Sequence, residues 1–563
     1  MSRTRAVNRR DFLKGATVTG AAALVPNAAV GATAQAPPPA AAQSARPATA
    51  PVAARETDPV VEVEAITTDR PGGDFMVDVL KSLNFEYIAS NPGSSFRGVH
   101  ESIVNYGNNR MPEFITCCHE ESGVAMAHAY FKAEGKPMAV LCHGTVGLQH
   151  AAMAIYNAYC DRVPVYILAG NSLDATMRRP GVEWAHSVQD AASMVRDFIK
   201  WDDTPVSLPH FAESAVRAYK IAMTPPMMPV LVVIDGGLQE DPIPAEIASR
   251  LRVPKLTVAT PPQGDSGAVA EAARLLVNAQ NPVIVADRLA RTPAGIARLV
   301  ELADTLQAPV VDQHGRMNFP SRHALNQTES ASQLIANADV ILGLELTDFW
   351  GTVSAFRDAL HRTSRSRIQP GTRLISITAV DLYTKSNFQD FQRYPEVDVA
   401  MAADAEATLP ALTEACRRLV TDDRRRVFGE RRQRLEQAHA RAREASRVEA
   451  SYAWDATPIS TGRMAAEIWA QIRTEDWSLV SESGNSSGWG VPVVGLRQAL
   501  SALGGLRWRR RRLRRTGRGG RGARPQEARP VVGEHPRRRR PAVCAWCLVD
   551  GRASPDSAAH GDA

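Results

Sequence analysis

Short apolar runs separated by helical patterns constrain the fold of this chain more than any other feature. The runs in its first half are "FEYIASNPG", "FITCCHE", "MAVLCHG", "VPVYILAGN" and "PVLVVID". They are apolar almost throughout, as strands buried on both faces of a parallel sheet are. The helical pattern over residues 122–134 ends at "GKP", which is a helix-stop signal. This alternation predicts an α/β protein built from doubly wound parallel sheets.

The same alternation divides the chain into units. It runs over residues 60–245 and, after a Pro- and Gly-containing linker, resumes over residues 262–420 with "NPVIVADR", "APVVDQHG" and "ADVILGLEL". An Arg- and Glu-rich pattern over residues 421–455 predicts a solvated connecting helix. A third α/β unit begins over residues 456–495. A chain of 563 residues has room for about three domains of roughly 150 to 200 residues each.

The N-terminus, residues 1–36, has the pattern of an export signal. Arg9 and Arg10 precede "DFLKGA", an Ala-rich apolar stretch follows, and "ATAQA" offers small residues for cleavage. This resembles a twin-arginine signal, which exports folded proteins and predicts a periplasmic location; a cytoplasmic location is the alternative. The apolar stretch is too short and interrupted to span a membrane, so no stable membrane insertion is expected. Residues 37–59, rich in Ala and Pro, are expected to form a disordered linker.

The segment "FITCCHEESGVAMAHAYFKAEGKP" carries the most chemical information. It predicts a strand that ends at His119 and Glu120, with a helix beginning at once. Ligands of open α/β sheets bind at the carboxyl ends of the strands, and a carboxylate beside a helix N-terminus is held ionised. By itself the pattern leaves a second interpretation open, in which Glu120 and Glu121 are merely exposed acids of a first helical turn.

The segment resembles the pyrimidine-binding domain of thiamine-diphosphate enzymes of the acetolactate synthase type. The shared features are the His-Glu pair, a small-residue helix with an aromatic residue ten positions after the Glu, and a Gly-Lys-Pro turn. The resemblance implies that Glu120 is the catalytic acid, which hydrogen-bonds a ring nitrogen of the cofactor's aminopyrimidine. That contact favours the imino tautomer, which removes the thiazolium proton and creates a carbanion nucleophile.

Further segments agree with this resemblance in order and spacing over residues 70–495. The turn "SNPGSSF" is closer to the Asn-Pro-Gly-Ser turn of the benzoylformate decarboxylase branch than to the Tyr-Pro-Gly turn of synthases. The stretch "CHGTVGLQHA" stands where the family has a Gly-Pro-Gly loop, with Thr145 in place of the Pro and Gln149 near a usual Asn. The cofactor-binding residues implied by the resemblance are Asn91, Pro92, Gly93, His119, Gly144, Thr145 and Gln149.

The implied function is carboligation or decarboxylation of a 2-oxo acid with thiamine diphosphate and Mg2+, in the manner of acetolactate synthase. A decarboxylase of the benzoylformate type and a non-catalytic relative are the alternatives. The family assembles its sites between two subunits, so a homodimer or homotetramer is expected. The sequence does not decide whether the central unit binds FAD, and it shows no Gly-rich phosphate loop there.

The stretch after Gly495 departs from this organisation. Residues 496–563 hold 17 Arg, no Lys and 5 acidic residues, a net charge of +12, which leaves −6 for the preceding residues out of the total of +6. The mildly acidic body gives no reason to expect nucleic acid as a partner. The tail itself is open to three interpretations: a nucleic-acid-binding arm, a disordered tail and an out-of-frame translation. The CxxC of Cys544 and Cys547 has no second ligand pair, so no zinc or other metal site is assigned.

An out-of-frame translation explains the tail best. Residues 496–563 contain no Lys, Ile, Phe, Tyr, Met or Asn, as a GC-rich gene read in the wrong frame would give. Codons AGG CGA CGG CGA for the arginines at 537–540, followed by C, read one base later as Gly-Asp-Gly-Asp, which contains the family's Mg2+-binding motif. We therefore expect the diphosphate-binding domain to be truncated near Gly495, and the chain as written to bind thiamine diphosphate poorly or not at all.

Overall fold

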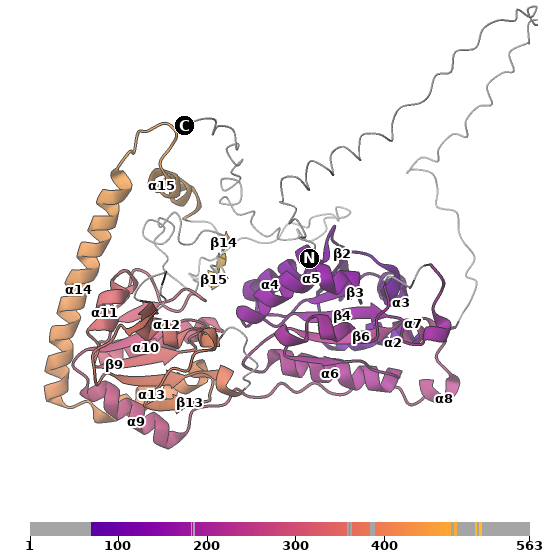
Figure 1. Ribbon diagram of the computed structural model, residues 1–563, viewed down its shortest axis with the longest axis horizontal. Coiled ribbons are helices and arrows are strands. Elements are labelled where there is room, and N and C mark those ends of the chain that lie inside the picture. The colour runs from indigo at the N-terminus through magenta and orange to yellow at the C-terminus, as the bar shows by residue number, and fades with distance from the viewer. Residues whose placement is uncertain are drawn as a thin grey trace, which may run out of the picture. The chain divides into compact units, whose positions relative to one another are not determined.

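The computed structural model describes residues 69–181, 183, 186–356, 360, 363–382, 389–473, 478–480, 502–503 and 506–508. The predicted export signal, the predicted linker and most of the Arg-rich tail lie outside the described residues. Two parallel sheets with helices packed against them make up most of the described chain (Figure 1). The predicted α/β fold with doubly wound parallel sheets is confirmed.

The first sheet has six parallel strands in the order β2-β1-β3-β4-β6-β5. The strands are β1 (Tyr87–Ser90), β2 (Glu113–Thr116), β3 (Ala139–His143), β4 (Tyr166–Asn171), β5 (Trp201–Asp203) and β6 (Val230–Asp235). Strands β3 and β4 are buried along their whole length because they lie inside the sheet. The strand order reverses between β1 and β3, and the carboxyl ends of strands at such a reversal are where open α/β sheets bind ligands.

Strand β2 differs from its prediction. It lies at an edge of the sheet, and its side chains are half-buried or exposed. It ends at Thr116, before the His-Glu pair, and Cys118 is exposed. The predicted buried strand over "FITCCHE" is therefore shorter and less buried than expected, because an edge strand has a neighbour on one side only.

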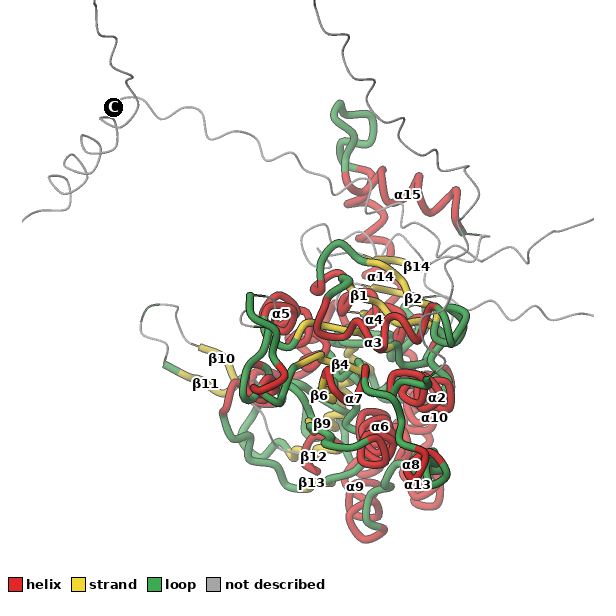
Figure 2. The backbone as a smooth tube through the Cα atoms, turned by 90° about the vertical axis from the view of Figure 1, so that its right-hand side faces the viewer, coloured by secondary structure: helices red, strands yellow, loops and turns green. Residues whose placement is uncertain are grey.

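Helices cover both faces of the first sheet (Figure 2). They are α2 (Gly72–Ser82), α3 (Arg97–Val104), α4 (Glu120–Glu134), α5 (Val146–Cys160), α6 (Leu208–Met223) and α7 (Gly236–Glu240). The short helix α8 (Ala245–Ala248) follows and has no buried residue. Helices α2, α3 and α6 bury their apolar side chains in one core, and α4 and α5 in the other. Successive residues of β3 alternate between the two, with Ala139 and Leu141 in the first core and Val140 and Cys142 in the second. This alternation follows from the two-residue period of a strand.

The second sheet has five parallel strands in the order β13-β12-β9-β7-β8. The strands are β7 (Pro282–Ala286), β8 (Val310–Asp312), β9 (Val340–Leu344), β12 (Arg373–Ile377) and β13 (Val399–Met401). Helices α9 (Ser266–Asn278), α10 (Pro293–Leu306) and α13 (Ala405–Leu419) pack on one face, and α11 (Ala331–Ala336) and α12 (Phe349–Val353) pack on the other. A short antiparallel pair, β10 (Ser354–Phe356) and β11 (Ser364–Ser366), follows α12.

The region predicted as a connecting helix forms α14 (Asp422–Ser451), which has 30 residues. Most of its side chains are outside the core, but Phe428 and Leu435 pack into the core of the second sheet. Helix α15 (Thr461–Ile472) comes next, and a small antiparallel sheet joins β14 (Ser478–Val480), β15 (Ala502–Leu503) and β16 (Leu506–Trp508). No helix within the described ranges is long and apolar enough to cross a membrane.

Candidate functional site

Glu120 is the first residue of α4 and lies just beyond the carboxyl end of β2. Its side chain is only 4% exposed. No side chain or backbone group of the described residues donates a hydrogen bond to its carboxylate. Burying a carboxylate without a partner is costly, so a ligand that donates a hydrogen bond there would be favoured.

The segment from Gly144 to Gly147, between β3 and the first turn of α5, approaches this carboxylate at Gly147. A Cβ atom on Gly147 would lie 3.2 Å from Glu120 Oε1, so the absence of a side chain leaves space beside the carboxylate. A Cβ atom on Gly144 would lie 2.4 Å from the carbonyl oxygen of Gly170 in β4. The backbone can come this close to β4 only because residue 144 is glycine. The hydroxyl oxygen of Thr145 is buried and has no hydrogen-bond partner within the described part of the chain. The Thr145 hydroxyl, two residues before Gly147, is thus a buried polar group that the described residues leave unpaired.

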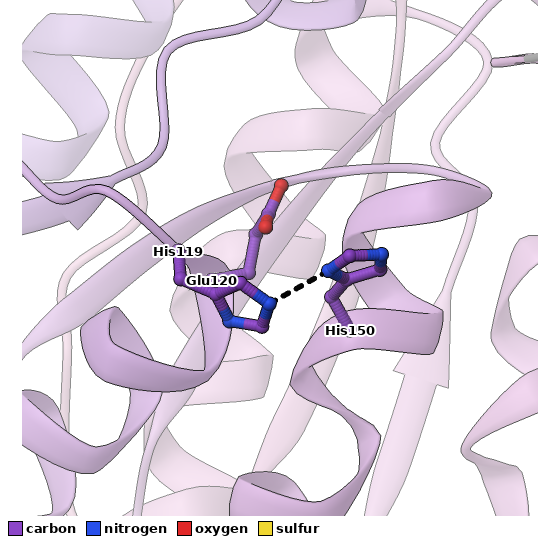
Figure 3. Close-up of side chains that lie close together, drawn as sticks. All are labelled: His119, Glu120 and His150. Carbon is purple, nitrogen blue, oxygen red and sulfur yellow. Dashed lines mark hydrogen bonds between the residues drawn. The ribbon is translucent and has the colours of Figure 1, made fainter.

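His119 caps the N-terminus of α4 and contacts a second histidine. Its Nδ1 accepts a hydrogen bond from the backbone N–H of Glu121 at 3.2 Å. The proton of a neutral His119 ring is therefore on Nε2, which lies 2.8 Å from Nδ1 of His150 on α5 (Figure 3). His150 was not predictable from the sequence, because no residue pattern near it shows that the first turns of α4 and α5 are neighbours.

The predicted Asn91–Gly93 turn packs against a third histidine, His143, at the end of β3. A Cβ atom on Gly93 would lie 1.9 Å from Nε2 of His143, so only glycine fits there. Ser95, in the short 3-10 helix η1 (Ser94–Phe96), forms a hydrogen bond of 2.9 Å with Nδ1 of His143. The ring of His186 lies 4.5 Å from that of His143, centroid to centroid.

His143 has a perturbed protonation equilibrium. Burial lowers the pKa of its imidazole below the ordinary value, the neighbouring His186 lowers it further, and the carboxylate of Glu120 opposes the shift. The ring is therefore neutral at pH 7, and it can accept a proton or, from its N–H, donate one. His143 and Ser95 were not predicted from the sequence, although a histidine at the last position of a buried strand, directly before Gly144, was an available signal.

The predicted site residues do not all come together equally. His119, Glu120, Gly144 and Thr145 lie around the carboxyl ends of β2 and β3. The turn of Asn91, Pro92 and Gly93 follows β1 and contacts His143, but Pro92 is exposed. Gln149 is also exposed, and the described residues provide no contact between its side chain and Glu120.

The corresponding edge of the second sheet also holds a buried glutamate. Glu345, directly after β9, accepts hydrogen bonds from Nη1 of Arg162 at 2.7 Å and from the backbone N–H of Ala405 at 3.0 Å. The hydroxyl of Thr378 and the backbone N–H of Ala379 each donate to it at 3.1 Å. A small cavity beside this glutamate is lined by the guanidinium groups of Arg162, Arg288, Arg291 and Arg316.

Models of known protein families match both regions that contain a parallel sheet. The model for the N-terminal TPP binding domain of thiamine pyrophosphate enzymes matches residues 70–193, and the model for the central domain of the same enzymes matches residues 269–412. The model for the twin-arginine translocation pathway signal sequence matches residues 6–26.

Individual relatives are distant. A benzoylformate decarboxylase of Pseudomonas aeruginosa is 29% identical over 240 residues, which are 40% of this chain and 44% of the relative. An acetolactate synthase of Bacillus subtilis is 23% identical over 280 residues, which are 48% of this chain and 47% of the relative. A sulfoacetaldehyde acetyltransferase of Rhodobacter capsulatus is 25% identical over 264 residues, 45% of this chain and 42% of the relative. The chain thus spans under half the length of these relatives.

A solved structure from Mycobacterium smegmatis, described as a thiamin diphosphate-dependent enzyme, shares the fold. It has a TM-score of 0.51 and 24% identity, and the match covers 63% of this chain and 64% of that one. The models for two successive domains of one family match in their usual order, on the two sheets that the structure contains. The chain therefore contains the N-terminal and central domains of thiamine-pyrophosphate-dependent enzymes and is acetolactate synthase-like, with acetolactate synthases among its relatives.

Proposed function

We propose that the site around Glu120 binds the aminopyrimidine ring of thiamine diphosphate, in a carboligase or decarboxylase that acts on 2-oxo acids. The observation that carries this proposal is the buried carboxylate of Glu120, which has no hydrogen-bond donor among the described residues. The aminopyrimidine ring, protonated at a ring nitrogen, offers the missing donor. The bound cofactor supplies a nucleophilic carbon that adds to the carbonyl group of a 2-oxo acid.

The residues of this chain would position the ring and hold its proton. Glu120 accepts the hydrogen bond from the ring nitrogen, and the free hydroxyl of Thr145 offers a second polar contact. Gly147 leaves space at the carboxylate that a side chain would fill. His119, as the helix cap, fixes the first turn of α4 on which Glu120 is placed. The site thus supplies position and protonation, while the cofactor supplies the chemistry.

A saturation-transfer NMR experiment with free thiamine tests this proposal, because it detects weak binding. We expect saturation to reach the pyrimidine protons in the full chain and to disappear in Glu120→Gln. Glutamine keeps the size of the side chain but removes the charge that attracts a protonated ring. Equal saturation in both proteins would show that the pyrimidine does not bind at Glu120. Glu121→Gln is the matched control, since Glu121 also lies in the first turn of α4 but is exposed.

A 2-oxo acid decarboxylase of the benzoylformate type is the second candidate. A decarboxylase must deliver a proton to the carbon that loses CO2, whereas a carboligase joins that carbon to a second carbonyl group. His143, held by Ser95 and lying near Glu120, is a neutral imidazole suited to proton transfer. Product analysis with pyruvate and with an aryl 2-oxo acid separates the two. A 2-hydroxy-3-oxo acid with a longer carbon chain than the substrate supports the carboligase, and an aldehyde as the organic product supports the decarboxylase.

The twin-arginine match supports export, and we propose that the protein acts in the periplasm. We also propose a homodimer or homotetramer. Two large apolar side chains on the helices that carry the site, Met126 and Met153, are 39% and 58% exposed, which supports a contact of these helices with a second copy. Light scattering of the purified protein tests this, and a monomer at micromolar concentration would contradict it.

The Arg-rich stretch after Gly495 is proposed to be an out-of-frame translation of a diphosphate-binding domain. Resequencing the codons for residues 491–510 tests it. An extra or missing base there would support the proposal, and an unchanged sequence would contradict it. If a base is found, the corrected chain should bind thiamine diphosphate with Mg2+ more tightly than the chain as written.

A further inference from the structure

We propose that His119, Glu120 and His150 form a binding site for a divalent transition-metal ion. One ligand atom of each residue lies within 4.8 Å of the ligand atoms of the other two. The two imidazole rings, one from the start of α4 and one from α5, face each other beside the glutamate (Figure 3). This site is distinct from the Mg2+ that the family uses with the cofactor's diphosphate, and it does not depend on the proposed function.

The chemistry of the three ligands selects the kind of ion. Two imidazole nitrogens and one carboxylate oxygen suit Zn2+, Co2+ or Ni2+, whereas Mg2+ and Ca2+ prefer oxygen ligands throughout. Three protein ligands leave at least one coordination position for water, as in catalytic rather than structural zinc sites. Among the described residues this is the group of histidine, cysteine and carboxylate side chains whose ligand atoms come this close.

The two histidine nitrogens already converge on one point. His119 Nε2 and His150 Nδ1 are 2.8 Å apart and share one proton in a hydrogen bond. Two nitrogens bound tetrahedrally at roughly 2.0–2.1 Å from one zinc ion are about 3.3 Å apart. The rings therefore need to separate by only about 0.5 Å for the ion to replace the proton. Binding should release that proton to solvent.

Glu120 gives the site its charge. Its carboxylate is buried and has no donor among the described residues, so a cation beside it would supply the compensation that the chain itself does not. His150 is exposed, which gives an ion a path from solvent and lets this ring move. If Glu120 also binds the aminopyrimidine, as proposed above, the ion and the cofactor would compete for one carboxylate.

The capping role of His119 limits the affinity. Its Nδ1 accepts the backbone N–H of Glu121, but when Nε2 binds an ion the remaining ring proton must be on Nδ1. The capping hydrogen bond is then lost or the ring must turn. This conflict also provides a variant: His119→Asn keeps a side chain that caps helices well but removes the imidazole.

A titration of the chelator-treated full chain with Co2+, followed by absorption, tests the proposal. We expect a saturable visible band with a stoichiometry of one ion per chain, accompanied by proton release. Cysteine ligands would instead produce a thiolate charge-transfer band in the near ultraviolet. The spectrum therefore separates this site from binding at cysteines such as Cys118, which is exposed.

Three variants make the assignment specific. His150→Gln and His119→Asn should each weaken Co2+ binding by at least ~10-fold. Removing a residue that only hydrogen-bonds to a metal ligand already costs about this much, so removing a ligand should cost no less. His210→Gln is the control, because His210 is a partly exposed histidine 3.3 Å from the carboxylate of Asp203 but has no second histidine in its group. Absence of the visible band or a thiolate band alone would overturn the proposal. So would a Co2+ affinity in His150→Gln and His119→Asn equal to that of the unmodified chain. His150→Gln replaces an exposed side chain, so loss of binding in this variant is not explained by unfolding.

Discussion

The two parallel sheets each end beside a buried glutamate, and the surroundings of these two side chains are opposite. Glu120, at the first sheet, and Glu345, at the second, are both 4% exposed. Glu345 accepts hydrogen bonds from a guanidinium group, a hydroxyl and two backbone N–H groups. Glu120 accepts none from the described residues. Burial alone therefore does not identify a functional carboxylate; the missing partner does.

Two further ion pairs lie at the edge of the second sheet that holds Glu345. Arg291 pairs with Asp404 at 2.7 Å, and Arg288 pairs with Asp287 at 2.7 Å. The pairs lie around the small cavity, where the Nε atoms of Arg288 and Arg316 are buried without a hydrogen-bond partner among the described residues. The edge of the first sheet has a carboxylate without a donor among the described residues and a buried hydroxyl without a partner there. The carboxylate of the second edge is satisfied by the chain itself, and the carboxylate of the first edge is left for a ligand.

The largest expected effect is on folding, from the glutamate that is fully bonded. Glu345→Gln removes the charge opposite Arg162 and leaves that buried guanidinium without its carboxylate. Breaking a buried ion pair in this way costs about 3–5 kcal/mol. Denaturant unfolding, followed by fluorescence, should show this loss in the free energy of unfolding.

Glu120→Gln is the matched comparison in the same unfolding experiment. It removes a buried charge that has no partner, so the free energy of unfolding should not fall by more than about 0.5 kcal/mol. A loss as large as that of Glu345→Gln would mean that Glu120 is a structural residue. The contrast between the two edges would then be wrong.

The sequence predicted the fold from local patterns but did not distinguish these two glutamates. Strands such as β3 and β4 were predictable because their residues are buried on both faces. Glu120 and Glu345 both follow apolar runs in the sequence, and nothing local to either shows whether a donor will reach it. The donor for Glu345 is Arg162, which is 183 residues away in the chain.

The partners of the candidate site were hidden for the same reason. His150 is 31 residues from His119, and His143 is 48 residues from Ser95. Such contacts depend on how the strands are ordered in the sheet, which hydrophobic periodicity does not determine. Glu120 itself was predictable because a short local motif placed it at the start of a helix.

An intermediate effect is expected from the glycine that contacts His143. Gly93→Ala would put a Cβ atom 1.9 Å from Nε2 of His143, so the turn and the ring must separate. Overpacking of this kind costs about 1–3 kcal/mol. Gly429→Ala is the control, because a Cβ atom there meets no atom within 4 Å inside α14. It should stabilise the protein by about 0.5–1 kcal/mol, the helix-propensity difference between the two residues. Equal melting temperatures for both variants would contradict the close packing at the first edge.

The smallest effect is a change in the pH dependence of stability caused by His143. The pKa of His143 in the folded protein lies below its ordinary value because the ring is buried and faces His186, while Glu120 partly offsets the shift. Below about pH 6.5 the unfolded chain therefore binds a proton that the folded chain does not, and stability falls as the pH falls. One such group changes the free energy of unfolding by at most about 1.4 kcal/mol per pH unit.

His143→Asn removes this contribution, so its unfolding free energy should decline less steeply than that of the unmodified chain between about pH 6.5 and pH 5. His186→Phe keeps an aromatic ring against His143 but removes the second imidazole, so it should reduce the slope only in part. His323, packed beside the second sheet, provides the comparison between the regions, since burial also lowers its pKa while Asp304 opposes the shift. His323→Asn should also make the unfolding free energy decline less steeply with falling pH. The double variant His323→Asn and His186→Phe should have a smaller slope than His323→Asn alone. If His143→Asn and the unmodified chain give parallel curves, folding does not lower the pKa of His143, and His143 is not the acid–base group that distinguishes the first edge from the second.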